Sequence, residues 1–318
     1  MKGIQHVEVS NRDAKYKFDL HRNITIVRGN SGTGKTTLFD MITDYTRLKK
    51  SSGVNISCEK ECVSLIDTDW QHQLQNISDS IVFIDEGSEY LRSKKFAETI
   101  KNTDNYYVIF NRESLHELPY SVEEIYEIHP SGKYYSFKKM YQSNKKDIYY
   151  KDHIDEKSKI DILLTEDSKS GFQFYENYFK DTETKCEPSY SNADIFKRLK
   201  EHKDRKILVI ADGAAFGSEI DRVLKLQSSI SFKICLPESF EWLILKSGLI
   251  KTDDIKQMLD NPAEYIESSE FFSWENFFEE YLVRNTVNTP FQYSKKKINP
   301  VYLGANAKKI ISEIYTKK

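Results

Sequence analysis

ITIVRGNSGTGKTTL, residues 24 to 38, sets the architecture of the first half of the chain. Its opening apolar run, Ile24 to Val27, is rich in β-branched residues and predicts a buried strand. Residues 29 to 36 match the pattern G-x-x-x-x-G-K-[ST] at every position, and apolar residues recur at helical spacing after them. A strand, a glycine-rich turn and a helix in this order predict a loop whose backbone N–H groups and helix N-terminus cradle phosphate.

The residue types in this loop have separate physical roles. Glycines allow the backbone conformations and the close approach that a phosphate cradle needs. We expect Lys35 to neutralise the β- and γ-phosphates and the Thr36 hydroxyl to ligate Mg²⁺, with ATP as the bound nucleotide. The alternative is a glycine-rich turn that binds nothing. The full set of expected nucleotide contacts is Gly29, Asn30, Ser31, Gly32, Thr33, Gly34, Lys35, Thr36 and Thr37.

A second motif follows in residues 80 to 86, SIVFIDE. Its consecutive apolar residues predict a strand buried on both faces, and the strand ends in Asp85 and Glu86. We expect Asp85 to hold Mg²⁺ through water and Glu86 to be the catalytic residue that polarises the attacking water. With the loop upstream, the chain resembles P-loop ATPases of the catalytic-glutamate class, the ABC- and AAA-like proteins with Walker A and Walker B motifs.

This resemblance implies a polar residue at the end of the next strand that senses the γ-phosphate. Asn111 follows the apolar run 106–110 and fills that place, with Arg112 as the second candidate and helix capping as the alternative role of Asn111. The fifty residues from Lys35 to Asp85 contain no LSGGQ-like signature and no coiled-coil heptads, which argues against a transporter and against a full ABC, SMC or RecF architecture. Many ATPases of this class take an arginine from a neighbouring subunit, so self-association is a further expectation.

Length, composition and net charge limit the number of domains, the cellular location and the classes of partner that we expect. The length of 318 residues predicts two domains, and 39% hydrophobic with 30% charged residues is typical of a globular protein. No apolar run approaches the roughly 18 residues of a membrane span, and the N-terminus lacks the pattern of a signal peptide. We therefore expect a cytoplasmic protein without a membrane partner. A net charge of −2 gives no global basic field, so nucleic acid would contact a local patch. The basic cluster 293–297 could contact phosphates, and a solvated loop is the alternative that its composition favours.

Local composition divides the chain into segments. Residues 143–159 are charged and polar and predict a linker between an ATPase domain, 1–142, and a second α/β domain, 160–250. Residues 251–318 predict a helical C-terminal extension. Alternating strands and helices predict a parallel sheet in both α/β domains, preceded by a hairpin near the N-terminus.

In the second domain, acidic residues follow two expected strands. Ligand sites in parallel sheets lie beyond the carboxyl ends of the strands, and Glu166 and Asp212 are placed there. This half resembles the Toprim domain of topoisomerases, primases and OLD-family ATPase-nucleases, which implies that Glu166 and Asp212 hold Mg²⁺ for phosphodiester chemistry. Ala214 stands where that family has a second aspartate. The acids Asp167, Glu219 and Glu241 are the other candidates for the missing ligand. The alternative is an α/β domain whose strand-end acids cap helices or bind nothing.

Three interpretations follow from these motifs. The first is an ATP-binding and ATP-hydrolysing protein whose nucleotide state controls the second domain, with a metal-dependent nuclease in DNA processing or phage defence as its sharpest form. The second is a non-catalytic, nucleotide-dependent switch or scaffold that recruits a protein or nucleic acid. The third is a small-molecule kinase, which would need a lid with clustered arginines; residues 36 to 85 contain only Arg47.

Overall fold

The computed structural model describes residues 2–66, 69–141 and 159–316, and it divides into two compact units. Unit 1 contains the described residues up to Tyr141 together with Asn261–Phe272. Unit 2 contains the described residues from 159 to Asp260 and from Ser273 onward. The expected linker, 143–159, lies outside the described residues except for residue 159.

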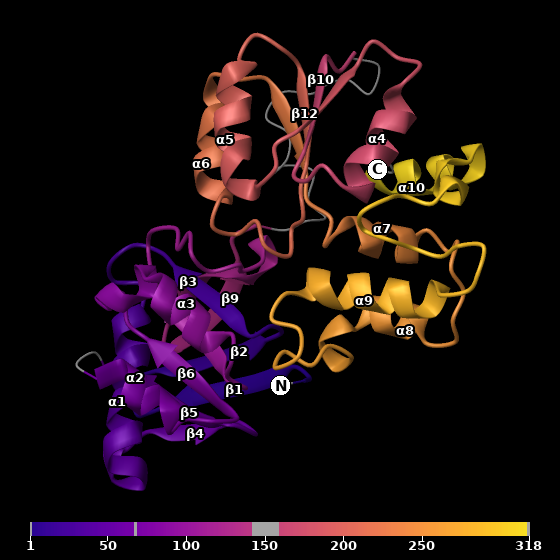
Figure 1. Ribbon diagram of the computed structural model, residues 1–318. Coiled ribbons are helices and arrows are strands. Elements are labelled where there is room, and N and C mark those ends of the chain that lie inside the picture. Colours follow the sequence, from indigo (N-terminus) through magenta and orange to yellow (C-terminus); the bar gives the residue numbers. More distant parts are fainter. Residues whose placement is uncertain (1, 67–68, 142–158, 317–318) are drawn as a thin grey trace. The chain divides into compact units, whose positions relative to one another are not determined.

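Unit 1 is built around a nine-stranded sheet. Its strands are β1 (Gln5–Ser10), β2 (Lys15–Leu20), β3 (Ile24–Arg28), β4 (Asn55–Ser57), β5 (Glu61–Leu65), β6 (Ser80–Ile84), β7 (Tyr106–Phe110), β8 (Ile125–Ser131) and β9 (Tyr134–Lys139). They are arranged in the order β4-β1-β2-β9-β8-β3-β7-β6-β5 (Figure 1). The helices and 3₁₀ turns are α1 (Lys35–Leu48), η1 (Lys49–Ser52), α2 (Trp70–Gln75), η3 (Glu89–Arg92), α3 (Lys94–Ile100), η4 (Val122–Glu124) and η6 (Pro262–Glu264).

The expectation of a parallel sheet in this first domain is wrong. The adjacent strands β8-β3-β7-β6-β5 are parallel, but β1 pairs antiparallel with β2 and β4, and β8 pairs antiparallel with β9. Tight turns explain the β1–β2 and β8–β9 pairs. The Asn11 side chain accepts hydrogen bonds from the N–H groups of Asp13 and Ala14, and Gly132 turns the chain with a φ of +63°. Such turns reverse the strand direction at once, whereas parallel neighbours need a long crossover.

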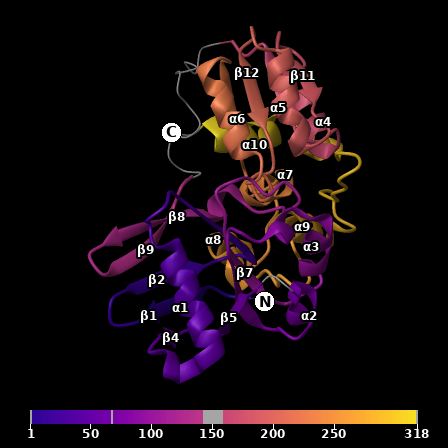
Figure 2. The same ribbon diagram turned by 90° about the vertical axis from the view of Figure 1, so that its left-hand side faces the viewer.

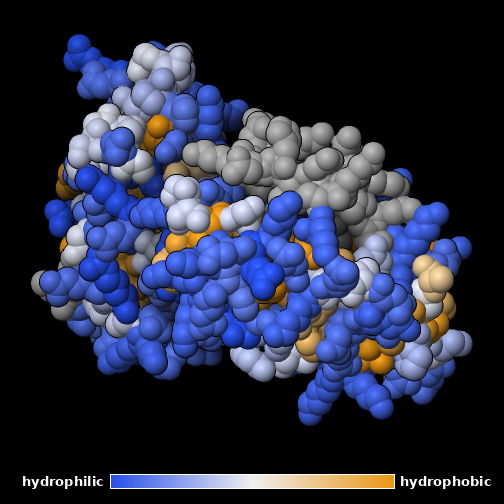
Figure 3. Space-filling view, turned by 90° about the horizontal axis from the view of Figure 1, so that it is seen from above, coloured by the Kyte–Doolittle hydropathy of each residue, from blue (hydrophilic) through white to orange (hydrophobic). Residues whose placement is uncertain are grey.

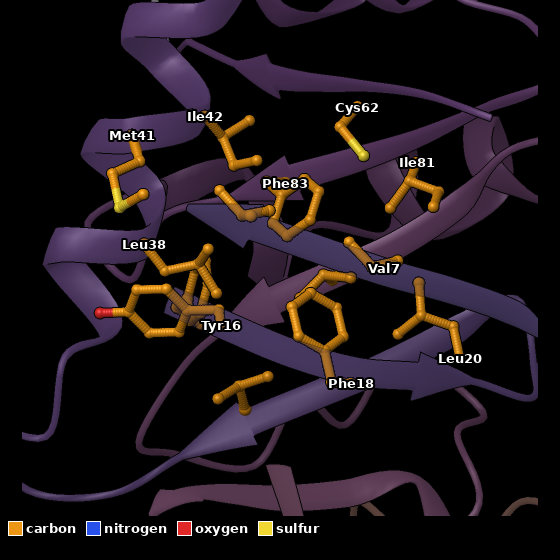
Figure 4. Packing of buried hydrophobic residues seen from close by; sticks show 14 of the residues in the cluster. Val7, Tyr16, Phe18, Leu20, Leu38, Met41, Ile42, Cys62, Ile81 and Phe83 are labelled. Atoms are coloured by element: carbon orange, nitrogen blue, oxygen red, sulfur yellow. The ribbon is translucent and has the colours of Figure 1, made fainter. Parts of the chain in front are cut away.

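The mixed sheet curls until it is nearly closed. Phe18 of β2 packs edge-to-face on Phe83 of β6 with ring centroids 6.4 Å apart, although β9, β8, β3 and β7 lie between them in the sheet. Leu38 and Ile42 of α1 are fully buried in the same core, which Figure 4 shows between the helix and the strands. Residues of the antiparallel strands and of the parallel strands therefore share one hydrophobic core with the helix that follows the glycine-rich loop.

A late segment of the chain completes unit 1. The N–H of Gly3 donates to the carbonyl of Ala263 over 2.8 Å, and the side-chain amide of Asn23 donates to the carbonyl of Phe272 over 3.1 Å. We expected this segment, Asn261–Phe272, within the helical C-terminal extension; its contacts place it with the first unit instead.

Unit 2 contains a four-stranded parallel sheet, as the alternation of strands and helices in this half predicts. Its strands are β10 (Ile162–Thr165), β11 (Lys185–Pro188), β12 (Ile207–Ile210) and β13 (Phe232–Cys235), in the order β11-β10-β12-β13. The edge strand β11 was not expected from the sequence. The helices and 3₁₀ turns are α4 (Ser170–Phe179), α5 (Asn192–Glu201), α6 (Ile220–Leu224), η5 (Lys225–Ser228), α7 (Phe240–Lys246), α8 (Ile255–Asp260), α9 (Trp274–Thr286), η7 (Pro300–Leu303) and α10 (Ala305–Thr316).

Helices cover both faces of this second sheet. The two views in Figures 1 and 2 place α5 and α6 on one face and α4 on the other. No helix in the described part of the chain is both long enough and apolar enough to cross a membrane. On the face drawn in Figure 3, hydrophilic side chains prevail and hydrophobic ones form small spots among them.

Candidate functional site

The glycine-rich loop of unit 1 connects β3 to α1. Gly29, Gly32 and Gly34 have φ values of +123°, +81° and +99°, which are strained for residues that carry a Cβ atom. Gly34 occupies the N-cap position of α1 and has no side chain to cap the helix. The first N–H groups of α1 therefore need partners from outside the helix, and an anion would supply them.

Lys35 is nearly buried beneath this loop. Its side chain is 7% exposed, and its Nζ donates to the carbonyl oxygens of Gly29 and, over 3.0 Å, of Asn30. Burial lowers the pKa of Lys35; the nearby Glu86 carboxylate opposes this shift and Arg112 adds to it. The ammonium group thus lies at the loop, close to the residues that follow β6 and β7, and is held by neutral carbonyls that a phosphate can replace.

Two tyrosines support the loop from the antiparallel strands, and sequence analysis missed both. The Tyr16 hydroxyl of β2 donates to the carbonyl of Gly34 over 2.9 Å, and its ring stacks on that of Tyr135 of β9 with centroids 4.4 Å apart. A Cβ atom at Gly34 would lie 2.8 Å from the Tyr16 hydroxyl oxygen and 2.9 Å from the Tyr135 ring. Gly34 is therefore required by close packing as well as by its backbone conformation.

Three adjacent parallel strands bring the other expected residues to the loop. β7 lies between β3 and β6, and the register pairs Val27 with Phe110 and Ile84 with Ile109. The segments after the three strands consequently meet at one edge of the sheet. They are the loop itself, Asn111 with Arg112, and Asp85 with Glu86.

Arg112 links two of these segments. Its Nε lies 2.9 Å from Oε1 of Glu86, and a terminal guanidinium nitrogen donates to the Ser31 hydroxyl over 3.1 Å. Asn111 is only 3% exposed, and its side-chain amide donates to the carbonyl of Glu113 over 2.9 Å. The side-chain hydrogen bond of Asn111 is thus local, whereas Arg112 reaches the glycine-rich loop.

The expected Mg²⁺ ligands of unit 1 lie around the start of α1. Thr36 is exposed, and Asp40, one helical turn further on, lies on the same face of the helix. Burial raises the pKa of Asp40, and the charges of Asp44 and Asp85 raise it further. Asp85 is therefore near enough to Asp40 for its charge to act on that carboxyl group. A hydroxyl and carboxylates are the oxygen ligands that Mg²⁺ prefers, so the residue types suit the ion, but no group of three or more His, Cys, Asp or Glu among the described residues is arranged to hold one.

Unit 2 has a small pocket at the carboxyl end of its parallel sheet. The residues that line it are Thr165, Glu166, Asp167, Ser170, Gly171, Phe172, Tyr175, Ile210, Asp212, Pro237, Phe240, Glu241 and Lys295. The backbone N–H of Asp212 donates to Oε2 of Glu166 over 2.9 Å, so the structure brings the two expected metal ligands together. Burial raises the pKa of Glu166 to about 7, the Asp212 N–H opposes the shift, and Glu275 and Asp167 add to it. The pKa of Asp212 is raised well above its ordinary value, by burial and then by Glu275, Glu166 and Glu241.

This pocket does not fit a divalent metal. Ala214, at the position of the family's second aspartate, is 3% exposed. No group of three or more His, Cys, Asp or Glu side chains among the described residues is arranged to hold a metal ion. The Lys295 ammonium already stands among the carboxylates: it contacts Glu275 of α9 and lies 3.1 Å from Oε2 of Glu279. We derive no chemical step from a metal at Glu166 and Asp212.

The basic cluster 293–297, expected to contact nucleic acid, has some side chains buried and others exposed. Tyr293 is 3% exposed, and its hydroxyl donates to Oε1 of Glu241 over 2.6 Å. Lys295 points into the carboxylate pocket, whereas Lys296 and Lys297 are exposed. Of the lysines in 293–297, two are therefore available for contact with phosphates at the surface.

The chain was compared with protein-family models, with curated proteins and with solved structures. No family model, no curated protein and no solved structure matches it. Function is therefore argued from the sites themselves.

Proposed function

We propose that this protein binds ATP at the loop of residues 29 to 37 and hydrolyses it, and that the nucleotide state controls unit 2. The observation that carries the proposal is the strand order β3-β7-β6, because it gathers a phosphate-binding loop, a basic residue and a pair of acids at one sheet edge. Arg112 and Glu86 lie close enough to Lys35 to shift its pKa. Transfer of a phosphoryl group to water requires cations that stabilise the charge on the phosphate. It also requires a group, such as a carboxylate, that orients the attacking water.

Each residue has a stated role in this proposal. The N–H groups of the loop and of α1 bind the phosphates, and Lys35 exchanges its carbonyl partners for phosphate oxygens. Glu86 orients the attacking water, and Arg112 contacts the γ-phosphate. Mg²⁺, held by Thr36 and through water by Asp85, would neutralise charge on the phosphates when it is bound with ATP.

The test is ATP turnover by the purified full-length chain, with and without DNA, for wild type and Glu86→Gln. Glu86→Gln should lower turnover by about 10²–10⁴-fold, the usual contribution of a general base, while a fluorescent ATP analogue still binds. Glu89→Gln is the matched control, since Glu89 is an exposed acid three residues further along the chain. Equal turnover in wild type and Glu86→Gln would overturn the hydrolytic role of Glu86, and a failure of wild type to bind ATP would overturn the whole proposal.

For unit 2 we propose the non-catalytic alternative, a domain that recruits a protein or nucleic acid in response to nucleotide. Ala214 and the placement of Lys295 support it over the metal-dependent nuclease. The discriminating assay is DNA cleavage with Mg²⁺ or Mn²⁺, by wild type and by Asp212→Ala. Cleavage that disappears in Asp212→Ala would favour the nuclease, and absence of cleavage with either metal supports recruitment.

A further inference from the structure

We infer that Lys295 is the resident cation of the strand-end pocket in unit 2, and that it keeps divalent metal ions out of that pocket. This inference concerns unit 2 alone and does not depend on ATP binding in unit 1. It follows from where the ammonium group lies, from how the segment that carries it is held, and from the charges around it.

The ammonium group is held from two helices. On α9 its partners are Glu275 and Glu279, which lie one helical turn apart; Nζ of Lys295 is 3.1 Å from Oε2 of Glu279. On α7 its neighbour is Glu241, with Oε1 at 4.0 Å. The Lys295 side chain is 16% exposed, so this is a lysine largely withdrawn from solvent rather than a surface side chain.

The chain on either side of Lys295 is fixed to α4, the helix that follows β10. The N–H of Ser170 donates to the carbonyl of Lys295 over 2.9 Å, and the hydroxyls of Ser170 and Tyr293 share a hydrogen bond of 2.6 Å. Gln173 binds the same segment twice, donating to the carbonyl of Lys296 and accepting from the N–H of Ile298, each over 3.0 Å. These bonds set the position of Lys295 relative to the end of β10, the strand that Glu166 follows directly.

Lys295 lines the same pocket as Glu166 and Asp212. Among the described residues, no other lysine lines this pocket. Burial by itself lowers the pKa of Lys295, but Glu241, Glu275 and Asp212 outweigh it and raise the pKa above its ordinary value. The ammonium is therefore charged, and the acidic groups around it stabilise this charge. A divalent ion at Glu166 and Asp212 would face this positive charge across a small, poorly solvated space.

The turn after β12 offers no second acidic side chain at Gly213 or Ala214. A Cβ atom at Gly213 would lie 2.7 Å from the carbonyl oxygen of Leu236, so this turn is tightly packed on the loop after β13. Ala214 follows it and is buried. A lysine among the acids and an alanine in place of an acid both lower the affinity for a divalent ion, and the two features are consistent with each other.

The experiment measures Mn²⁺ binding to the nucleotide-free full-length chain by electron paramagnetic resonance. Asp85→Asn is present in every sample to weaken the site in unit 1. Lys295→Met removes the charge and keeps the length of the side chain. This variant should bind one additional Mn²⁺ ion at the pocket, with an affinity at least about 10-fold higher than the affinity of the same pocket in the parent protein that keeps Lys295. Adding Asp212→Asn should abolish the new site. Lys296→Met is the matched control, because Lys296 is the exposed neighbour, and it should behave like the parent.

Two results would overturn the inference. One is a parent protein that binds Mn²⁺ tightly and loses it in Asp212→Asn, since Lys295 would then not exclude the metal. The other is a folded Lys295→Met protein, checked by circular dichroism, that gains no Mn²⁺ site. If Lys295→Met does not fold, the comparison of the parent with Asp212→Asn still decides, because the inference requires that both bind Mn²⁺ equally weakly.

Discussion

Arg112, in the segment after β7, forms an ion pair with Glu86, in the segment after β6: its Nε lies 2.9 Å from Oε1 of the carboxylate. The side chains are 51% and 36% exposed, so the pair contributes only about 0–1 kcal/mol. A phosphate group at the loop can therefore compete for the guanidinium, which already reaches the Ser31 hydroxyl. Movement of Arg112 toward phosphate would free Glu86 to accept a hydrogen bond from water.

This arrangement predicts that Arg112→Ala lowers ATP turnover by about 10²–10³-fold, the loss typical of a donor that stabilises transition-state charge. ATP and ADP affinity should change much less than turnover. Arg112→Lys keeps the charge but not the two-armed geometry, and it should restore only part of the activity. If Arg112 merely restrains Glu86, removal of its guanidinium would raise turnover, and steady-state kinetics would show that outcome directly.

Packing around the loop predicts that Gly34→Ala is more damaging than other glycine substitutions in unit 1. The added methyl group would collide with Tyr16 and the Tyr135 ring in addition to straining the backbone, so we expect a loss of about 1–3 kcal/mol in unfolding free energy. ATP binding should weaken with it. The control is Gly53→Ala, where φ is +74° but no atom lies within 4 Å of the added Cβ. Urea unfolding should show the smaller loss there; equal losses would mean that the tyrosine contacts add nothing.

The thiol of Cys58 should react faster than the other cysteines near neutral pH. A hydrogen bond from Cys62 lowers the pKa of Cys58 to about 7, and Cys58 is half-buried. Burial raises the pKa of Cys186 and of Cys235 to about 11. Because the thiolate is the nucleophile, the rate of Cys58 alkylation should rise with a midpoint near pH 7.

Mass spectrometry after brief iodoacetamide treatment at several pH values would measure the rate at each cysteine. Cys62→Ala removes the hydrogen bond and should slow Cys58 at pH 7. Modification of Cys186 or Cys235 at the same rate as Cys58 would contradict the assignment.

Local sequence signals predicted the elements of the proposed phosphate-binding site but not how the sheet surrounds them. The apolar run before Gly29 forms β3, and the apolar run before Asp85 forms β6; both are read from neighbouring residues. The pairing of β2 with β9 joins residues more than a hundred positions apart, and no local pattern encodes it. That pairing places Tyr16 and Tyr135 together, which is why neither tyrosine could be recognised as part of the site.

Lys295 shows the same limit in unit 2. In the sequence it belongs to a run of lysines that reads as a solvated or phosphate-binding loop. Its partners, Glu241 and Glu275, lie on helices that are separate in the sequence, so only the fold distinguishes it from Lys296 and Lys297. A motif of adjacent residues can be read locally, but a charge that is neutralised through tertiary contacts cannot.

The raised pKa of Glu166 predicts that unit 2 is more stable in mildly acidic than in alkaline solution. The folded state holds the Glu166 proton up to about pH 7, whereas the ordinary value of 4.5 applies to the unfolded chain. The folded state thus binds more protons between these values, and the free energy of unfolding should fall as pH rises through this range, by about 1–3 kcal/mol.

Glu166→Gln should reduce this fall. Glu176→Gln, which replaces an exposed acid on α4, should not. Urea unfolding at pH 5 and pH 8, in a Trp70→Phe background, would follow Trp242 and Trp274 of unit 2 alone. A stability that rises toward pH 8 equally in all three proteins would contradict the buried, protonated state of Glu166.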